Sequence, residues 1–178
     1  MVALSELELP NGVKAEVSQE GDEIKISGSL GSTRKRINTK LLEVKVQNGK
    51  LVIEKTPNQK LEKKALLAEM ALTKELKEAI EGVQNGITRH MRVVYAHFPI
   101  SFEIKGNLLL AKNFYGEHLP RAAKIIGDTK VEIKGQDIYV KGVDPYDVNQ
   151  TVANLFKLSF QKNKDSRIFQ DGIYPVKE

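Results

Sequence analysis

Short runs in which apolar and polar residues alternate recur along the chain and predict β-strands. The first half has such runs at residues 13–17, 24–26, 44–46 and 51–53. A period of two with one apolar face is typical of a half-buried strand, so these runs predict an antiparallel sheet with a covered face. The Asn48-Gly49 pair predicts a hairpin turn between two of the strands, because both residues tolerate positive φ angles.

Two other segments have apolar residues at every third or fourth position, and each predicts one long amphipathic helix. The first predicted helix runs from Gln59 to Glu81, with Asn58 as its N-cap and Gly82 as its stop. Its apolar stripe consists of Leu61, Ala65, Ala68, Leu72, Leu76 and Ile80.

The second predicted helix begins at an Asp144-Pro145 pair. Asp144 can accept hydrogen bonds from the free N–H groups of the first turn, Pro145 suits the first helical position, and Asp147 complements the helix dipole. Its apolar stripe consists of Val148, Val152, Leu155 and Ser159, with Phe156 beside it.

Landmarks in the two halves of the chain recur in the same order, 85 to 86 positions apart. The six pairs are Gly21 and Gly106, Gly31 and Gly116, Arg36 and Arg121, Gly49 and Gly135, Asn58 and Asp144, and Gly86-Ile87 and Gly172-Ile173. This repetition predicts a tandem duplication. We therefore predict an α+β fold of two related modules, residues 1–87 and 88–178, each an antiparallel sheet packed against one long helix. Residues 88–99 alternate as well and predict a strand that leads into the second module.

The distribution of charge indicates which module is more basic. The 178 residues include 28 Lys and Arg against 23 Asp and Glu, a net charge of +5. Residues 1–86 contain 14 basic and 13 acidic residues, whereas residues 87–178 contain 14 and 10, so the excess lies mainly in the second module. A basic surface there favours a polyanionic partner, with a solvated surface as the alternative.

Several classes of protein are disfavoured by what the sequence lacks. The chain has no cysteine, which excludes disulfides, thiol catalysis and zinc sites with cysteine ligands. No apolar run approaches the roughly 18 residues of a membrane helix, and the first residues do not resemble a signal peptide. We expect a cytoplasmic protein without a membrane partner.

Catalytic and metal-binding chemistry finds no support in the residue pattern. The histidines His90, His97 and His118 have no second ligand at metal-binding spacing, and no P-loop or nucleophile motif is present. Asp165 and Asp171 could form an acid–base pair, but a loop charge and a turn residue are the simpler interpretation. We predict no enzyme, no metal and no cofactor.

Two segments of the second module combine basic, amide and aromatic residues. They are residues 112–124 and 161–174. Lysine and arginine attract phosphates, amides add orienting hydrogen bonds, and aromatic rings can stack on unpaired bases. Phe114, Phe169 and Tyr174 could equally be core or hinge residues. This composition favours RNA contact.

Several motifs in these and neighbouring segments resemble a known family. They are VVYAHFPI (93–100), NF-x-GE-x-x-PR-x-A (113–123), GDT-x-V-x-I-x-G (127–135), DV-x-QT-x-AN (147–154), RIFQDGIY (167–174) and, near the start, LELPNGV (7–13). Together with the duplication, they are similar to ribosomal protein L-six of the large subunit in its archaeal and eukaryotic form. The similarity is densest from Val93 to Tyr174.

The resemblance implies a structural, non-catalytic constituent of the large ribosomal subunit that supports translation. It implies binding to large-subunit rRNA, not DNA, mainly through the second module, near the sarcin–ricin loop and the factor-binding region. Neighbouring ribosomal proteins and, close by, translation factors are the other implied partners. The matching positions that could contact RNA or shape the contact loops are Asn113, Gly116, Arg121, Lys164, Arg167, Gln170, Gly172 and Tyr174. Charge alone adds Lys112, Lys124, Lys157 and Lys162.

Two other classes of function stay open at this point. A protein-interaction adaptor would expose a large apolar patch and bind without salt dependence, and an RNA-binding module could act outside the ribosome. For the RNA hypothesis, replacing Arg121 and Arg167 by alanine should reduce the salt dependence of binding by about one slope unit per lost phosphate contact.

Overall fold

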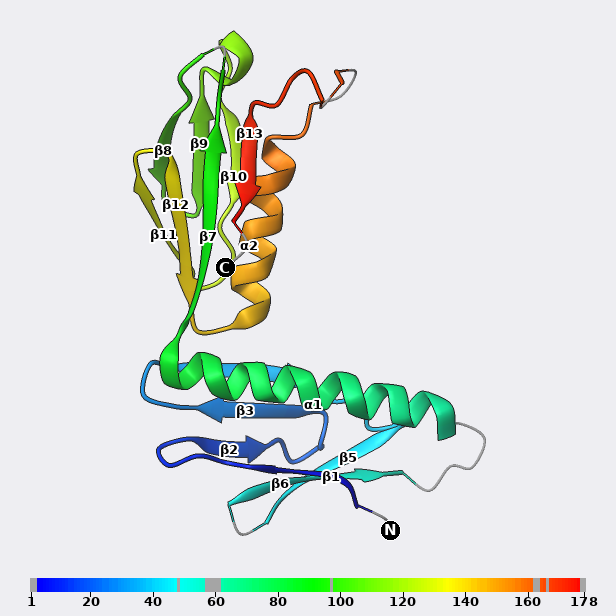
Figure 1. Cartoon of the computed structure of the whole chain (residues 1–178). Helices are drawn as coiled ribbons and strands as arrows, with labels where there is room; N and C mark the ends of the chain where they lie inside the picture. The colour runs from blue at the N-terminus through cyan, green and yellow to red at the C-terminus, as the bar shows by residue number, and fades with distance from the viewer. Residues whose placement is uncertain are drawn as a thin grey trace. The chain divides into compact units, whose positions relative to one another are not determined.

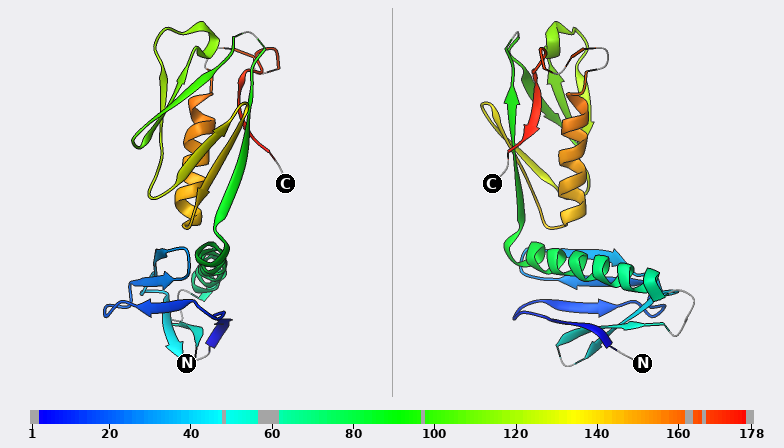
Figure 2. Two further views of the ribbon diagram at one scale, coloured as in Figure 1. Left: turned by 90° about the vertical axis from the view of Figure 1, so that its left-hand side faces the viewer. Right: turned by 45° about the vertical axis from the view of Figure 1, so that its right-hand side comes forward.

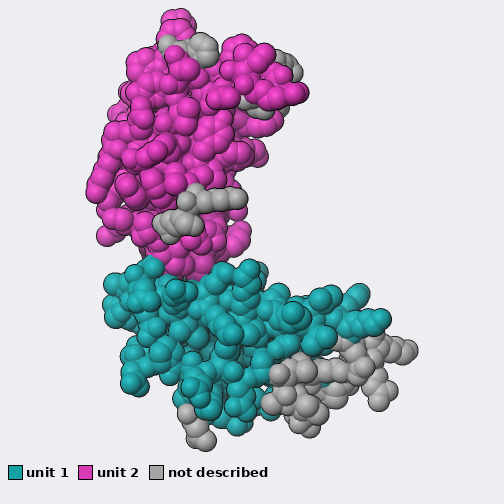
Figure 3. All heavy atoms as spheres, in the orientation of Figure 1, with its two compact units in different colours: residues 1–86 teal, residues 87–178 magenta. Residues whose placement is uncertain are grey.

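The computed structural model divides the chain into two compact units, residues 1–86 and 87–178 (Figure 3). The structure describes residues 3–47, 49–56, 62–96, 98–161, 164–165 and 167–176, without the side chains of residues 3, 4, 55 and 62. Within this part of the chain no helix is long and apolar enough to cross a membrane.

Unit 1 contains six strands followed by one long helix (Figure 1). The strands are β1 (Ala3–Glu8), β2 (Lys14–Val17), β3 (Glu23–Ser27), β4 (Ser32–Arg36), β5 (Leu42–Gln47) and β6 (Lys50–Lys55), and the helix is α1 (Glu62–Asn85). They form two antiparallel sheets with strand orders β1-β6-β5 and β2-β3-β4. The α1 helix packs on β3 and β4, where Ile24, Ile26 and Thr33 are buried.

Unit 2 repeats this arrangement with one additional strand. Its elements are β7 (Ile87–Val94), β8 (Ser101–Lys105), β9 (Leu108–Lys112), the short 3₁₀ helix η2 (Phe114–Gly116), β10 (Arg121–Lys124), β11 (Lys130–Lys134), β12 (Asp137–Gly142), α2 (Pro145–Leu158) and β13 (Gly172–Pro175). The sheets have strand orders β10-β9-β8 and β11-β12-β7-β13. The further views in Figure 2 show α2 lying along these strands, and its Val148 and Leu155 are fully buried in the core with Met91, Ile138 and Ile173.

The pairing order is the same in both units. β1-β6-β5 corresponds to β7-β12-β11, and β2-β3-β4 corresponds to β8-β9-β10. The α+β class with one long helix in each module is thus confirmed. The strands of each module pair as two separate sheets where the sequence predicted one, because alternation identifies strands without identifying their partners.

The strand register corrects one of the six sequence correspondences. Ile26 of β3 pairs with Thr33 of β4, and the equivalent Ala111 of β9 pairs with Arg121 of β10. Arg121 therefore corresponds to Thr33, not to Arg36. The offset changes because four residues (28–31) connect β3 to β4, whereas eight (113–120) connect β9 to β10. The longer connection in unit 2 contains η2 and most of the first RNA-candidate segment.

The end of α1 also differs from the prediction. The helix continues through Gly82 to Asn85, and Gly86 then adopts φ +73 and donates to the carbonyl of Gly82. Packing explains the longer helix, because Val83 is fully buried and lies against Gly28, where a Cβ would approach its side chain to 2.8 Å. The predicted start residues Asn58 and Gln59 lie outside the described residues, as does Leu61 of the stripe.

The start of α2 agrees with the prediction. The Asp144 carboxylate accepts a hydrogen bond from the backbone N–H of Tyr146 at 2.8 Å, and Pro145 is the first helical residue. The predicted strand at 88–99 is observed in part as β7, which buries Met91 and Val93 and ends at Val94; the described residues 95, 96, 98 and 99 are not in a strand. In the predicted hairpin turn Gly49 has φ +76, and Asn48 lies outside the described residues.

Candidate nucleic-acid interface

Three connections meet at one end of unit 2 (Figure 1). They follow β7, β9 and α2, and we call their described residues within 95–100, 113–120 and 159–171 the loop-end surface. Hydrogen bonds tie the connections together, two of them from side chains of the β9–β10 connection. The Asn113 side-chain amide donates to the carbonyl of Pro99 at 3.1 Å, and the Tyr115 hydroxyl donates to the carbonyl of Asp171 at 3.4 Å.

The connection from β9 to β10 is held in an unusual backbone conformation. Asn113 (φ 59) and Tyr115 (φ 51) are left-handed, as is Gly116 (φ 76). Asparagine and glycine tolerate this region, whereas a tyrosine there costs about 1–2 kcal/mol. The surrounding contacts must offset that cost. Asn113 and Gly116 therefore shape the loop, and a Cβ on Gly116 would also lie 3.4 Å from the Phe98 ring.

Arg121 is the centre of the contacts that fix these connections. Its Nε and Nη2 donate to the two carboxylate oxygens of Glu117 at 2.8 and 2.5 Å. Nη2 also donates to the Gln161 side-chain oxygen at 2.6 Å. Nη1 donates to the backbone carbonyls of Leu158 and Phe160 at 3.0 and 3.4 Å. A guanidinium has five N–H donors, and these hydrogen bonds give each of the five an acceptor within the protein.

The guanidinium of Arg121 is also partly buried and packs on an aromatic ring. The Arg121 side chain is 21% exposed, and its guanidinium carbon lies 4.4 Å from the centre of the buried Phe114 ring. Arg121 thus joins the β9–β10 connection to the end of α2. To contact a phosphate, Arg121 would have to give up these acceptors. We therefore expect a reduced salt dependence of RNA binding on replacing Arg167, but not on replacing Arg121.

The ion pair between Arg121 and Glu117 predicts a pH dependence of stability. Hydrogen bonding to the guanidinium holds the pKa of the Glu117 carboxyl below its ordinary value. A carboxyl whose pKa is lower in the folded state stabilises the fold above its unfolded pKa and loses this contribution as the pH falls through the folded value. We expect Glu117→Gln to be less stable than the unmodified chain at pH 7, with the difference shrinking below about pH 4.

Urea unfolding at pH 7, 5 and 3 measures this difference in free energy of unfolding. Glu81→Gln is the control, because Glu81 is an exposed residue of α1 in unit 1 and has no ion pair in the part of the chain that the structure describes. A Glu117→Gln deficit that persists at pH 3 would show that the charge of Glu117 does not contribute.

Two cations of the loop-end surface are presented outward. The Lys164 ammonium lies 4.4 Å from the Tyr115 ring centre and 4.6 Å from that of Phe169, and the residue is exposed. The Arg167 side chain is 90% exposed, with its Nε 3.4 Å from the Asp165 carboxylate. Such cation–π and surface ion pairs are each worth about 1 kcal/mol or less, so both cations can turn to phosphates at little cost.

The remaining residues of the last connection are mostly structural. Asp171 is 4% exposed and accepts the backbone N–H of Ala96 at 3.0 Å. The Tyr174 hydroxyl donates to the carbonyl of Gln170 at 3.0 Å. A Cβ on Gly172 would lie 3.1 Å from the Tyr174 ring, so a side chain there would require this ring to shift. Gln170 itself is exposed and donates to the Arg167 carbonyl.

Asp165 and Asp171 do not form an acid–base pair in this arrangement. The Asp165 carboxylate accepts the backbone N–H of Arg167 at 2.9 Å, which is a turn contact. Asp171 instead holds the connection after β7. Among the described residues no group of three or more His, Asp or Glu side chains could hold a metal ion.

The lysines predicted from charge alone are dispersed. Lys112 ends β9 at this surface and forms an ion pair with Glu103 at 2.5 Å. Lys124 is exposed at the opposite end of β10 from Arg121, and Lys157 is exposed in the last turn of α2. Lys162 lies outside the described residues. Lys124 and Lys157 stay predictions as separate phosphate contacts.

Sequence reasoning missed Tyr115, Glu117 and Gln161 as individual residues. Tyr115 has a left-handed backbone conformation, and its ring lies against the Lys164 ammonium. Glu117 and Gln161 are acceptors for Arg121, and only the four-residue spacing of Glu117 and Arg121 gave a local signal. The contact to Gln161 spans 40 residues and has no local signature.

Comparisons with known proteins find relatives that match almost the whole chain. The chain is 39% identical over 175 residues to large ribosomal subunit protein uL6 of Archaeoglobus fulgidus, covering 97% of this chain and 88% of the relative. It is 38% identical over 172 residues to the uL6 protein of Methanosarcina mazei, with 97% and 95% covered. The uL6 protein of Staphylothermus marinus is 36% identical over 173 residues, with 95% and 91% covered. No model of a known protein family matches the chain.

A duplicated α+β chain with a cationic loop surface and relatives of this kind is a ribosomal protein of the large subunit. The chain belongs to the uL6 family. The resemblance drawn from the sequence motifs is therefore confirmed. Because the family consists of structural components of the ribosome, its members are not enzymes and reside in the cytoplasm with the large subunit.

Proposed function

We propose that the chain is a structural component of the large ribosomal subunit that binds large-subunit rRNA through the loop-end surface of unit 2. The observation that carries the proposal is the pairing of two outward cations, Lys164 and Arg167, with a set of connections that Arg121 holds in place. Connections that are already fixed lose little conformational freedom on binding, which favours affinity.

The chemistry of the surface favours RNA over a protein partner as the main ligand. Exposed lysine and arginine supply the salt-dependent attraction to phosphates, and the Gln170 amide can add an orienting hydrogen bond. Tyr115 and Phe169 flank Lys164 and hold the cation in one place. Irregular rRNA offers phosphates and unpaired bases at varied angles, which suits a surface built from connections.

The finer location follows from the family resemblance and is part of the proposal. We expect contact near the sarcin–ricin loop and the factor-binding region, with translation factors close by. Large exposed apolar side chains on the same surface support additional contacts with neighbouring ribosomal proteins. They are Leu119, Phe160 and Ile168, which are 81%, 65% and 70% exposed.

Hydroxyl-radical footprinting of large-subunit rRNA with and without the full-length chain tests this function. We expect protected nucleotides in the sarcin–ricin loop and its adjacent helices. Protection confined to a distant rRNA domain would contradict the location, and no protection at any concentration of the chain would contradict RNA binding.

A further inference from the structure

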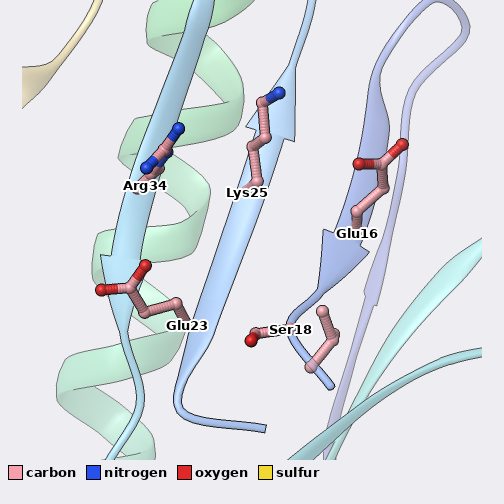
Figure 4. A pocket seen from close by; sticks show the side chains of 6 residues that line it. Glu16, Ser18, Glu23, Lys25 and Arg34 are labelled. Atoms are coloured by element: carbon pink, nitrogen blue, oxygen red, sulfur yellow. The ribbon is translucent and has the colours of Figure 1, made fainter. Parts of the chain in front are cut away.

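Unit 1 carries a second cationic surface, on the face of the β2-β3-β4 sheet that is turned away from α1 (Figure 4). Strand alternation directs Ile24, Ile26 and Thr33 into the core on one face. The other face carries Lys14 and Glu16 on β2, Glu23 and Lys25 on β3, and Arg34 and Arg36 on β4. We call these six residues the unit 1 sheet face. Four cations against two carboxylates give it a net positive charge.

The two central cations of this face oppose each other across the strands. Lys25 pairs in register with Arg34 on one side and Glu16 on the other. Directly opposed like charges destabilise a sheet. Neither Lys25 nor Arg34 has an ion pair or a side-chain hydrogen bond in the described part of the chain, whereas Glu23 lies 3.4 Å from the Arg36 guanidinium. The Glu16 carboxylate opposite Lys25 offsets part of this repulsion, and the arrangement leaves two cations available.

A shallow depression lies between these side chains. It has a volume of about 220 Å³ and is lined by Glu16, Val17, Ser18, Glu23, Lys25 and Arg34. In Figure 4 the Lys25 and Arg34 side chains extend alongside each other on neighbouring strands. An anionic group entering here would meet Lys25, Arg34 and the Ser18 side chain, with the carboxylates of Glu16 and Glu23 at the same depression.

The duplicated module shows that the fold does not require these cations. In unit 2 the same register aligns Glu103 with Leu110 and Ala122. Leu110 and Ala122 thus take the places of Lys25 and Arg34 on an equivalent sheet. At these two positions the copies differ in chemistry, so Lys25 and Arg34 need an explanation other than folding. The position of Arg36 keeps a cation, Lys124, in unit 2.

We propose that the unit 1 sheet face binds phosphates of RNA as a contact separate from the loop-end surface. Protein interfaces have an apolar centre, whereas nucleic-acid interfaces are more polar and more positive. None of the exposed large apolar side chains of the described residues lies on β2, β3 or β4. Lysine and arginine on alternate strand positions present charges roughly 7 Å apart, and these can engage successive phosphates of one RNA strand. The proposal goes beyond the loop-end function and does not depend on it.

The test uses the full-length chain with Lys25→Gln, Arg34→Gln and Arg36→Gln combined, bound to protein-free large-subunit rRNA over a range of salt concentrations. We expect log Kd to depend less steeply on log salt, by about two slope units for three lost phosphate contacts. The matched control is Lys63→Gln, Lys64→Gln and Lys77→Gln, which removes three exposed cations from α1 of the same unit. Circular dichroism checks that both variants are folded.

An unchanged slope for the sheet-face variant, or an equal loss in the α1 control, would overturn the proposal. So would an unchanged RNA slope together with lost binding to an acidic ribosomal protein, which would assign the face to a protein partner. Lys164→Gln combined with Arg167→Gln is measured in parallel. If that variant loses slope while the sheet-face variant does not, the loop-end function stands and only this inference fails.

Discussion

Replacing Arg121 by alanine is expected to lower the free energy of unfolding by about 2–4 kcal/mol, because several charge-assisted hydrogen bonds are lost and partly buried acceptors are left unpaired. The Glu117 carboxylate and the carbonyl of Leu158 would lose their donor. The β9–β10 connection would no longer be joined to the end of α2. RNA affinity should fall about tenfold as a consequence of disordered loops, with an unchanged salt slope.

Urea unfolding and filter binding over a range of salt concentrations measure the two effects. Arg121→Lys should recover less than half of the stability, since an ammonium cannot reproduce the planar fork. Arg89→Ala is the matched control in the same unit, because Arg89 is exposed and its side chain donates to Asn149 alone among the described contacts. An Arg121→Ala chain as stable as Arg89→Ala would contradict the structural role of the guanidinium.

Replacing Lys164 and Arg167 together by glutamine is expected to weaken rRNA binding roughly 10- to 100-fold at physiological salt and to lower the salt slope by about two units. Stability should fall by only about 1 kcal/mol, through the lost cation–π contacts of Lys164. The contrast with Arg121 follows from exposure, because Arg167 is 90% exposed whereas Arg121 is 21% exposed.

Filter binding of each variant to protein-free large-subunit rRNA gives the slope. Lys105→Gln combined with Lys130→Gln removes the same charge from strand ends opposite the loop-end surface. If both double variants lose affinity equally, net charge and not this surface determines binding.

Much of the fold could be predicted from the sequence because its signals are local. The Asp144-Pro145 pair and the apolar spacing of α2 predicted a helix whose cap and core residues are observed. The duplication was visible in glycine landmarks. The predicted end of α1 at Glu81 was wrong. The helix continues to Asn85, because the buried contact of Val83 with Gly28 outweighs the glycine stop signal at Gly82.

The roles of individual site residues were less predictable. The local sequence around a basic residue in a candidate RNA segment does not show whether its side chain faces solvent or the protein. Arg121 and Arg167 both lie in segments that combine basic, amide and aromatic residues. Glu117 is a local acceptor of Arg121, but its other acceptors, on Leu158, Phe160 and Gln161, lie 37 to 40 residues away in sequence. Only the three-dimensional arrangement separates a residue that holds the loops from one that is free to contact phosphate.

Site-directed cleavage of rRNA tests the central claim most directly. Because the chain contains no cysteine, Ile168→Cys provides a single attachment point for a tethered iron chelate on the loop-end surface, where Ile168 is 70% exposed. Met70→Cys, 61% exposed on α1, serves as the comparison. In assembled large subunits we predict strong cleavage of nucleotides around the sarcin–ricin loop from position 168. Strong cleavage from position 70 with none from position 168 would contradict the account.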